Sequence, residues 1–424
     1  MNNRKISLLL IEGSIPPPWG GISATMRLLL PRLVNYGYKI ADVVSIKHNP
    51  DVIERYLNQG IEVIFRRQVM WLDTFRFLFK EIKNLYNLKK SSKLDFKTFV
   101  DSMHTPGFWY LAAEKKLKRE KVDIIHSFDY PWSQGLTAIL LGKRFNAKVV
   151  LTTFGEVSPH QDELVHHDEK SRLMRPFVKW VLDRADKVTS LSHHCSKETE
   201  FVGFPSEKVD VLYWGIDVEE FKPSQDGTKL RKELGINDKL VILFQGQIRK
   251  RKGPQILLES ATLILKEVPD THFLFVGADF NLKDELEKKA QQIGISKNVT
   301  FLGPQSKEAL PSIFNACDIF CFPTCTTIEC QGLVQIQAMA CSKPVIASRI
   351  AGIPEITIDN ETGFLFEPGD SADLSKKAII LFKNPFLREK MGNAGRNRAV
   401  EHFSIDTMAK NFNTLYKNLL KTNE

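Results

Sequence analysis

Residues 322–354 read FPTCTTIECQGLVQIQAMACSKPVIASRIAGIP and contain a strand–helix–strand pattern. An apolar strand ends at Pro323, and a turn that carries Glu329 follows it. Gly332 then opens an amphipathic helix, and a second apolar strand at 344–347 leads into a glycine loop at 351–354. Strands joined by a helix in this way run parallel in one sheet, so the stretch predicts an α/β fold.

The same rhythm continues on both sides of this stretch. Short apolar runs alternate with longer helical patterns along most of the chain, which is typical of βαβ units in doubly wound parallel sheets. The strands predicted in the first half lie at 5–11, 40–46, 61–65, 122–126, 148–152, 187–191 and 208–212. Those predicted in the second half lie at 239–244, 272–276, 298–302, 318–322, 344–348 and 363–366.

A linker is expected between the two halves. Residues 213–238, YWGIDVEEFKPSQDGTKLRKELGIND, are rich in Pro, Gly, Asp and Ser. The sequence therefore predicts an N-terminal Rossmann-like domain at 1–215 and a C-terminal one at 216–400. The remaining residues, 401–424, are expected to form a helix that is a candidate to pack back across the domain junction.

The composition is that of an ordinary globular protein. The 424 residues fit two or three domains, and 43% hydrophobic with 26% charged residues excludes a mainly disordered, collagen-like or disulfide-framework chain. No apolar run reaches the ~18 residues of a transmembrane helix, and the run at 6–11 is too short for a signal peptide. Six cysteines fit a reducing compartment, so a cytoplasmic location is expected.

The net charge of +9 suggests an anionic partner, and one basic loop offers a place for it. In LVILFQGQIRKRKGP at 240–254, a strand ends at Gly246 and Lys252 precedes a predicted helix. A loop at the carboxyl end of a parallel strand is a natural anion site, because lysine supplies charge and the helix N-terminus supplies amide donors. The alternative is a solvated basic turn. The turn after the strand that ends at Pro323 is a second candidate. Its Glu329 carboxylate could accept hydrogen bonds from sugar hydroxyls, while amides near Gly332 and Leu333 face a phosphate.

Together these segments resemble the donor site of retaining glycosyltransferase family 4, whose members have the GT-B fold. The family pattern runs P-S-x-x-E-G-F-G-L-x-x-x-E-A-M-A-x-G-x-P-V, then G-G-x-P-E. This sequence matches it at Pro323, Glu329, Gly332, Leu333, Ala338, Met339, Ala340, Pro344, Val345, Gly352, Pro354 and Glu355. Residues 246–253 are similar to the family's G-R-x-x-x-x-K-G, and Gly303 matches a strand-end glycine. PPPWGGIS, with Gly20 and Gly21, resembles the glycine loop after the first strand.

The resemblance implies two Rossmann-like domains that face each other across a cleft, with a nucleotide-sugar donor on the C-terminal domain. The N-terminal domain would hold the acceptor, a glycan in the broad sense. The basic aromatic segment at 66–99 suggests a lipid-linked or polysaccharide acceptor. Glu329, Lys252 and His126 are the implied catalytic residues. The implied donor-binding residues are Gly20, Gly21, Gly246, Gln247, Arg249, Arg251, Lys252, Gly303, Glu329, Gly332, Leu333 and Gln337. Transfer would retain the anomeric configuration and need no metal and no cofactor. No nucleic-acid partner is expected, because no reading motif accompanies the basic charge of residues 66–99.

Three positions depart from the family pattern. Gln247 stands where the family has arginine, Gln337 replaces the second glutamate of E-x7-E, and Phe154 replaces the histidine of T-x-H-G. An amide offers a ribose one acceptor oxygen, and phenylalanine offers a sugar none. Two explanations are open: a lost activity that leaves a binding or scaffold protein, or a changed donor such as a dTDP-6-deoxyhexose.

Residues 66–99 interrupt the alternation of strands and helices. Apolar residues recur there at three- and four-residue steps: Trp71, Phe75, Leu78, Phe79, Ile82, Leu85 and Tyr86. Basic residues outnumber acidic ones in the same stretch, a pattern of helices that bind anionic membrane surfaces. A peripheral position on the inner membrane face is one interpretation, and a core-packed helix with a solvated basic side is the other.

Several histidines and cysteines lie outside these motifs. His126 follows a predicted strand and either lines the cleft mouth or is a satisfied structural histidine. The pairs at 166–167 and 193–194 lack a third ligand at metal-binding spacing, and the cysteines at 317, 321, 325 and 330 fit buried apolar positions better than zinc.

Overall fold

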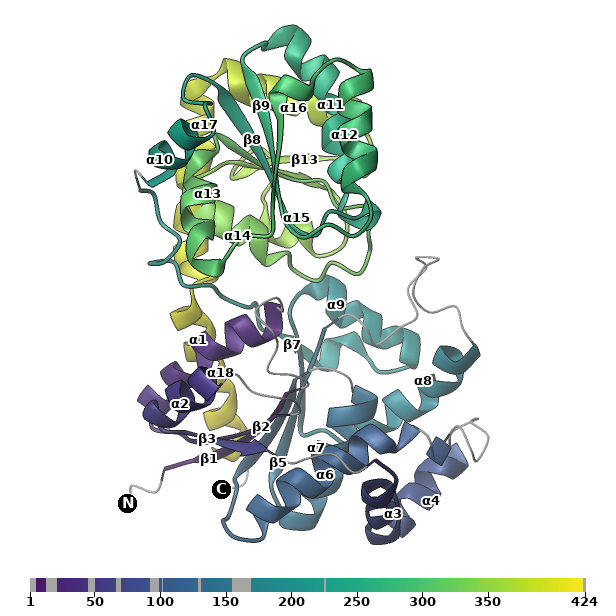
Figure 1. Ribbon diagram of the computed structural model, residues 1–424. Helices are drawn as coiled ribbons and strands as arrows, with labels where there is room; N and C mark the ends of the chain where they lie inside the picture. The colour runs from purple at the N-terminus through teal and green to yellow at the C-terminus, as the bar shows by residue number, and fades with distance from the viewer. Residues whose placement is uncertain are drawn as a thin grey trace. The chain divides into compact units, whose positions relative to one another are not determined.

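The computed structural model describes residues 5–12, 21–44, 50–65, 70–91, 99–100, 102–128, 131–154, 169–224 and 226–421. The chain divides into two compact units (Figure 1). Unit 1 comprises residues 1–213 and 406–424, and unit 2 comprises residues 214–405. The division falls at the start of the segment expected as a linker, and the last residues of the chain return to unit 1.

Unit 1 is built on a seven-stranded parallel sheet with the order β3-β2-β1-β4-β5-β6-β7. Its strands are β1 (Ser7–Glu12), β2 (Lys39–Val44), β3 (Ile61–Phe65), β4 (Ile124–Phe128), β5 (Lys148–Thr153), β6 (Lys187–Ser190) and β7 (Val209–Val211). Its principal helices are α1 (Gly21–Asn35), α2 (Pro50–Asn58), α3 (Met70–Lys80), α4 (Ile82–Ser91), α6 (His104–Leu117), α7 (Leu136–Phe145), α8 (Glu169–Leu182) and α9 (His193–Glu198), and α18 (Ile405–Lys421) joins them from residue 406 onward.

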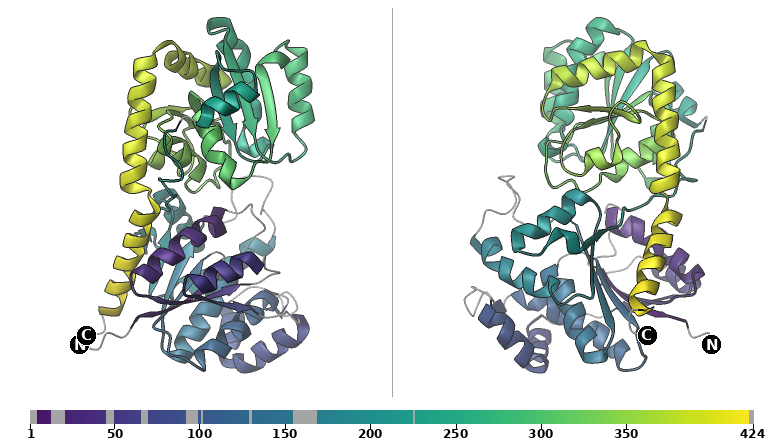
Figure 2. Two further views of the ribbon diagram at one scale, coloured as in Figure 1. Left: turned by 60° about the vertical axis from the view of Figure 1, so that its left-hand side comes forward. Right: turned by 180° about the vertical axis from the view of Figure 1, so that it is seen from behind.

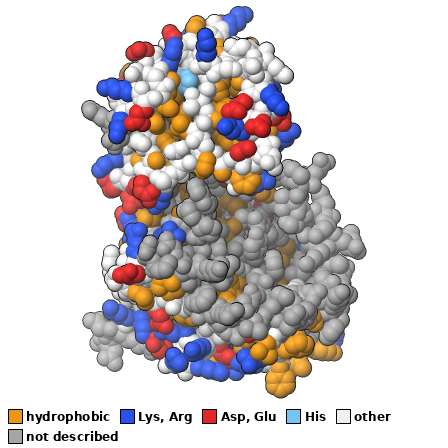
Figure 3. Space-filling view, viewed as in Figure 1, with side chains coloured by type: hydrophobic (Ala, Val, Ile, Leu, Met, Phe, Trp, Pro, Cys, Tyr) orange, Lys and Arg blue, Asp and Glu red, His pale blue; other side chains and the backbone are white. Residues whose placement is uncertain are grey.

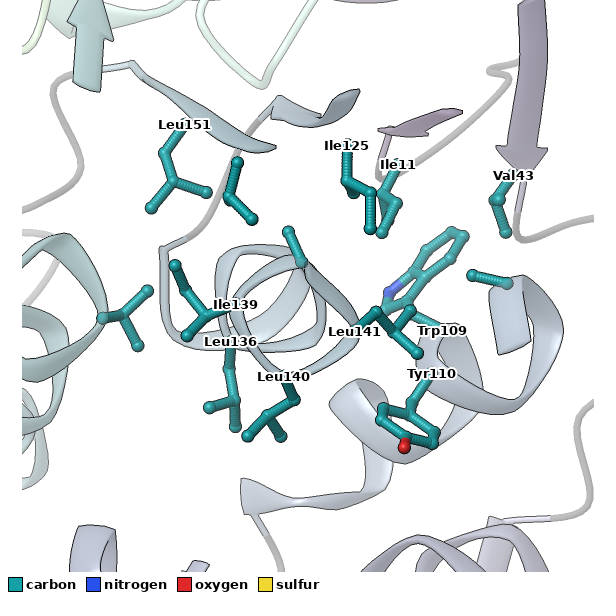
Figure 4. Packing of buried hydrophobic residues seen from close by; sticks show 14 of the residues in the cluster. Ile11, Val43, Trp109, Tyr110, Ile125, Leu136, Ile139, Leu140, Leu141 and Leu151 are labelled. Atoms are coloured by element: carbon teal, nitrogen blue, oxygen red, sulfur yellow. The ribbon is translucent and has the colours of Figure 1, made fainter. Parts of the chain in front are cut away.

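Helices cover both faces of this sheet, with α1, α2 and α18 on one side and α3, α4, α6, α7 and α8 on the other (Figures 1 and 2). A central strand enclosed on both faces must be apolar throughout, and Leu8–Ile11 ("LLLI") are all fully buried. On the second face, Ile125 and Leu151 of the sheet share one buried cluster with Leu136, Ile139, Leu140 and Leu141 of α7, and Trp109 of α6 lies beside Ile11 (Figure 4).

Unit 2 is built on a six-stranded parallel sheet with the order β10-β9-β8-β11-β12-β13. Its strands are β8 (Leu240–Gln245), β9 (Thr271–Val276), β10 (Val299–Gly303), β11 (Ile319–Phe322), β12 (Val345–Ser348) and β13 (Gly363–Phe366). Its helices are α10 (Asp226–Glu233), α11 (Pro254–Glu267), α12 (Lys283–Gln292), α13 (Leu310–Ala316), α14 (Leu333–Ala340), α15 (Ile353–Ile356), α16 (Ser371–Lys383) and α17 (Pro385–His402). Helices α11, α12 and α16 cover one face, and α10, α13, α14 and α17 cover the other (Figure 1).

The sheets confirm the expected α/β fold with two doubly wound Rossmann-like halves. Each of the thirteen predicted strands is present, with ends that differ by up to two residues. In unit 2 the chain first extends the sheet outward from β8 to β9 and β10, then returns to place β11 on the other side of β8. The carboxyl ends of β8 and β11 therefore meet where the strand order reverses, which is where open α/β sheets bind ligands.

Candidate functional site

The two segments singled out in the sequence lie together at this reversal point. β8 and β11 are hydrogen-bonded neighbours, with Ile319 opposite Ile242 and Phe320 opposite Leu243. The basic loop 246–253 follows β8, and the loop 323–332 follows β11. Because the strands are parallel, both loops emerge at the same edge of the sheet.

An ion pair joins the two loops. The Lys252 ammonium donates to the Glu329 carboxylate, and only 19% and 15% of these side chains are exposed. The Lys252 Nζ also lies 5.9 Å from the centre of the Phe322 ring at the end of β11. The site thus holds one cation and one anion side by side, poorly hydrated, and each can exchange its partner for a ligand group of opposite charge or for a hydroxyl.

Glycine is required at two positions that shape the site. Gly253 has φ of +75°, and a Cβ there would lie 1.8 Å from the Pro323 carbonyl oxygen. Gly332 has φ of +68°, and its Cβ would lie 2.6 Å from the Phe322 ring. L-residues avoid this backbone region and neither contact leaves room for a methyl group. Both glycines bring a helix N-terminus, of α11 and α14 respectively, close to the ends of β8 and β11.

Main-chain hydrogen bonds fix the loops to one another. The Arg251 carbonyl accepts from the Cys325 amide at 2.9 Å and from the Thr324 hydroxyl at 3.0 Å. The Gly352 amide donates to the Glu329 carbonyl at 3.1 Å, which ties in the glycine loop after β12. Three loops from three adjacent strands are therefore connected around Lys252 and Glu329.

The neighbouring predicted residues line the same edge. Gln247 accepts a bond from the Arg249 guanidinium at 3.3 Å, and that guanidinium lies 5.3 Å from the Phe280 ring centre. Gly246 directly follows β8, and Gly303 ends β10, two strands away. Leu333 begins α14 and Gln337 lies one turn further on, both half-buried. The roles of these residues toward a ligand stay predictions.

Two buried glutamines support the site and were not singled out from the sequence. Gln331 accepts from the Trp214 amide at 2.9 Å and donates to the Trp214 carbonyl at 2.7 Å. Gln335 donates to the Gln331 carbonyl at 2.6 Å and accepts from the Thr357 hydroxyl at 2.7 Å. The amide groups of both side chains are used in hydrogen bonds within unit 2, so these residues position the loop after β11. The only signal in the sequence was two polar residues at four-residue spacing around an apolar helix start.

The structure does not gather the site residues expected in unit 1 among the residues that it describes. Gly20 lies outside the described residues, and Gly21 begins α1. Phe154 follows β5 and is half-buried. His126 is fully buried in the middle of β4, so the expectation that it lines a cleft mouth is wrong.

The surroundings of His126 explain its place. Its Nδ1 pairs with the Tyr416 hydroxyl and its Nε2 with the Thr152 hydroxyl, both at 2.7 Å, and its ring stacks on Phe128. Burial holds the pKa of His126 well below its usual value, so the ring is neutral. Both nitrogens are occupied by unit 1 itself, and His126 is the satisfied structural histidine of the alternative interpretation.

The described ranges contain neither a cluster of metal ligands nor a membrane-spanning helix. No three His, Cys, Asp or Glu side chains of these ranges gather as metal ligands. The six cysteines are free thiols, four of them buried. No helix in these ranges is both long and apolar enough to cross a bilayer.

Comparisons with known proteins agree with this architecture. The family model "Glycosyl transferases group 1" matches residues 226–398, and the model "Glycosyltransferase Family 4" matches residues 90–220. The chain is 30% identical over 309 residues to N-acetyl-alpha-D-glucosaminyl L-malate synthase of Bacillus anthracis, covering 72% of this chain and 77% of that protein. It is 29% identical over 311 residues to D-inositol 3-phosphate glycosyltransferase of Mycobacterium sp. (strain KMS), covering 72% and 64%.

Among solved structures, Anabaena HepE in complex with UDP superposes with a TM-score of 0.72 at 18% identity, over 97% of this chain and 100% of that one. Such a likeness shows the fold, which is that of the two-domain α/β transferases. The family is shown by the sequence matches, which span both units. This chain belongs to the family 4 glycosyltransferases with the GT-B fold.

Proposed function

We propose that this glycosyltransferase takes its sugar from a nucleoside-diphosphate sugar bound at the carboxyl ends of β8 and β11. The Lys252–Glu329 pair carries the proposal, because it places a cation for a diphosphate beside an acceptor for sugar hydroxyls. The likeness to the HepE structures, solved with UDP and with UDP-glucose, supports this class of donor.

Donor binding would separate the ion pair. The Lys252 ammonium would turn to the diphosphate, and Glu329 would accept from hydroxyls of the donor sugar. The amides at the start of α14 would add further donors to the phosphates. Arg249 and Arg251 supply more positive charge from the same loop, whereas Gln337 would offer the ribose a single acceptor oxygen.

The proposed transfer retains the configuration at the anomeric carbon. The acceptor hydroxyl attacks from the face on which the leaving phosphate departs, so the anomeric carbon exchanges its phosphate oxygen for the acceptor oxygen. The acceptor proton passes to the departing phosphate. Lys252 and the helix N-terminus offset the negative charge that develops there, which is the stabilisation that a metal supplies in other transferases.

The acceptor in this proposal is a glycan, lipid-linked or polysaccharide hydroxyl compound held on unit 1. Phe154 replaces the histidine of the family's T-x-H-G, and the loss of that polar side chain would suit a 6-deoxy sugar. The alternative function is a degenerate transferase that binds a partner or nucleotide without transfer. Gln247, Gln337 and Phe154 are the residues that favour it.

A sugar-release assay tests the proposal without knowledge of the acceptor. Purified protein is incubated with UDP-glucose, GDP-mannose and a dTDP-6-deoxyhexose, with and without EDTA, and the products are followed by NMR. We expect slow release of one sugar, initially as the donor's own anomer, unaffected by EDTA and abolished by Lys252→Ala and Glu329→Ala. Binding without release, and without transfer to any tested acceptor, would favour the degenerate alternative. Equal or better use of UDP-glucose would exclude a preference for the deoxy donor.

A further inference from the structure

Helices α3 and α4 of unit 1 carry a row of exposed apolar side chains. The row consists of Leu72, Phe75, Phe79, Ile82 and Tyr86, which we call the α3–α4 surface. Their steps of three and four residues place them on one side of two consecutive helices. The exposed fractions reach 80% for Phe79 and 69% for Tyr86, whereas large aromatic side chains are normally covered.

This row is not needed for packing within unit 1. The opposite side of the same helices is buried in the core through Phe77, Leu85 and Leu88. Figure 3 shows the outward side as a group of hydrophobic side chains over α3 and α4, with Lys and Arg beside it. The two helices therefore have two apolar faces, and unit 1 uses one of them.

Polar anchors hold the α3–α4 surface in place. Glu81, at the junction of the two helices, is buried and accepts from the Tyr110 hydroxyl of α6. The Arg144 guanidinium of α7 donates to the same hydroxyl at 2.9 Å, and Lys80 pairs with Glu114 of α6. The outward row thus has a fixed orientation before any partner arrives.

The charges around the row have one sign. Both acidic residues of α3 and the junction, Asp73 and Glu81, are buried. Arg76, Lys83 and Lys90 are exposed, and no ion pair with an acid is present for them among the residues that the structure describes. The exposed side of α3 and α4 therefore combines apolar and cationic groups without a compensating anion.

We propose that the α3–α4 surface docks this enzyme on an anionic lipid bilayer. Helices with an apolar row and flanking cations lie in the interface plane, with the apolar side chains among the acyl chains and the cations at the lipid phosphates. At 11 and 10 residues, α3 and α4 are too short to span a bilayer and suit this parallel placement. The charge of one sign favours a lipid surface over a protein, whose interfaces usually offer both signs.

Vesicle sedimentation tests the proposal with the full-length protein and no substrate. The vesicles contain either phosphatidylcholine alone or equal parts of phosphatidylcholine and phosphatidylglycerol. We expect the wild type to sediment with the anionic vesicles and to be released by high salt. The double variant Phe75→Ser/Phe79→Ser should lower the partition coefficient at least tenfold, because two aromatic side chains that would insert among the acyl chains are removed. Arg76→Gln/Lys83→Gln/Lys90→Gln should lower it roughly a hundredfold, at about fivefold for each cation.

Matched variants keep the result specific. Phe386→Ser removes an aromatic side chain that is 77% exposed on α17 of unit 2 and should change nothing. Lys229→Gln/Lys288→Gln/Lys390→Gln removes the same charge from exposed positions of unit 2 and should cause a far smaller loss than the α3–α4 charge variant. Thermal unfolding of each variant shows that the fold is kept.

Three results would overturn the proposal. The wild type could stay in the supernatant with anionic vesicles, the Phe75/Phe79 variant could sediment like the wild type, or both charge variants could lose binding equally. If the wild type instead dimerises in analytical ultracentrifugation, and Phe75→Ser/Phe79→Ser abolishes the dimer, the surface is an interface between copies of this chain. None of these readouts depends on sugar transfer, so the donor proposal stands or fails separately.

Discussion

The ion pair at the donor site leads to a prediction with opposite signs for its two members. In the protein without ligand, Lys252 is paired with Glu329, so an incoming diphosphate competes with the carboxylate for the ammonium. Lys252→Gln should weaken binding of a nucleoside diphosphate. Glu329→Gln should strengthen it, because the amide no longer holds the lysine or repels the phosphates.

The magnitudes follow from the burial of the pair. With less than a fifth of either side chain exposed, a charge-assisted bond from Lys252 to phosphate is worth about 1.5–3 kcal/mol, or roughly 10- to 150-fold in Kd. The pair with Glu329 has the weaker geometry of two flexible side chains, so its release should gain about 1 kcal/mol, or roughly fivefold.

Isothermal titration calorimetry with the best-binding nucleotide among UDP, GDP, ADP and dTDP measures both changes. Lys250→Gln is the matched control, because it removes the same charge from the same loop at a side chain that is 74% exposed. It should change Kd less than about twofold. Glu329→Gln should nevertheless lose sugar release, since the carboxylate serves the sugar. The reasoning is refuted if Lys252→Gln binds like the wild type, or if Glu329→Gln weakens nucleotide binding as much as Lys252→Gln does.

Three further predictions concern stability and reactivity. Burial lowers the pKa of His126 in the folded protein. Below pH 6.5, the usual pKa of histidine, the unfolded chain therefore binds a proton at His126 while the folded chain does not. The free energy of unfolding should thus fall with decreasing pH by up to about 1.4 kcal/mol per unit in that window, and denaturant titrations of His126→Gln should show a smaller slope. Gly253→Ala should lower the free energy of unfolding by more than about 3 kcal/mol, because strain adds to the 1.8 Å clash. Gly235→Ala, with φ of +67° and open space, should lower it by about 1–2 kcal/mol, and equal losses would contradict this account. Iodoacetamide should modify the half-buried Cys325 and Cys330 first, since burial raises the pKa of Cys317 and Cys341 to about 12. Peptide mass spectrometry should also show protection of Cys325 and Cys330 by nucleotide, and uniform labelling would count against the site.

The fold could be predicted because its central strands are buried on both sides. Such strands read as unbroken apolar runs, as in Leu8 to Ile11 of β1, and they alternate with amphipathic helices. The sequence could also predict that Lys252 and Glu329 lie near each other, because each follows a strand of the same parallel sheet near the point where the strand order reverses. The ion pair itself depends on loop geometry that no periodicity reports.

The prediction for His126 failed for a physical reason. The strand was expected at 122–126, which would place the histidine at its end, whereas β4 extends over Ile124–Phe128 and places it in the middle. Its partner Tyr416 lies 290 residues away on α18, a contact that a local pattern does not contain. In residues 66–99, too, the local sequence pattern did not show which apolar side chains are buried. The sequence groups Leu85 with Phe79 in one apolar pattern, but in the structure Leu85 is buried in the core and Phe79 is exposed.

We expect unit 2 to hold a working nucleotide-sugar donor site at the carboxyl ends of β8 and β11. Calorimetric titration of the wild-type protein with UDP, GDP, ADP and dTDP tests it most directly. We predict one-to-one binding of one of these nucleotides, with the heat strongly reduced in Lys252→Gln. A folded protein that binds none of the four, or that binds equally well without Lys252, would contradict the account.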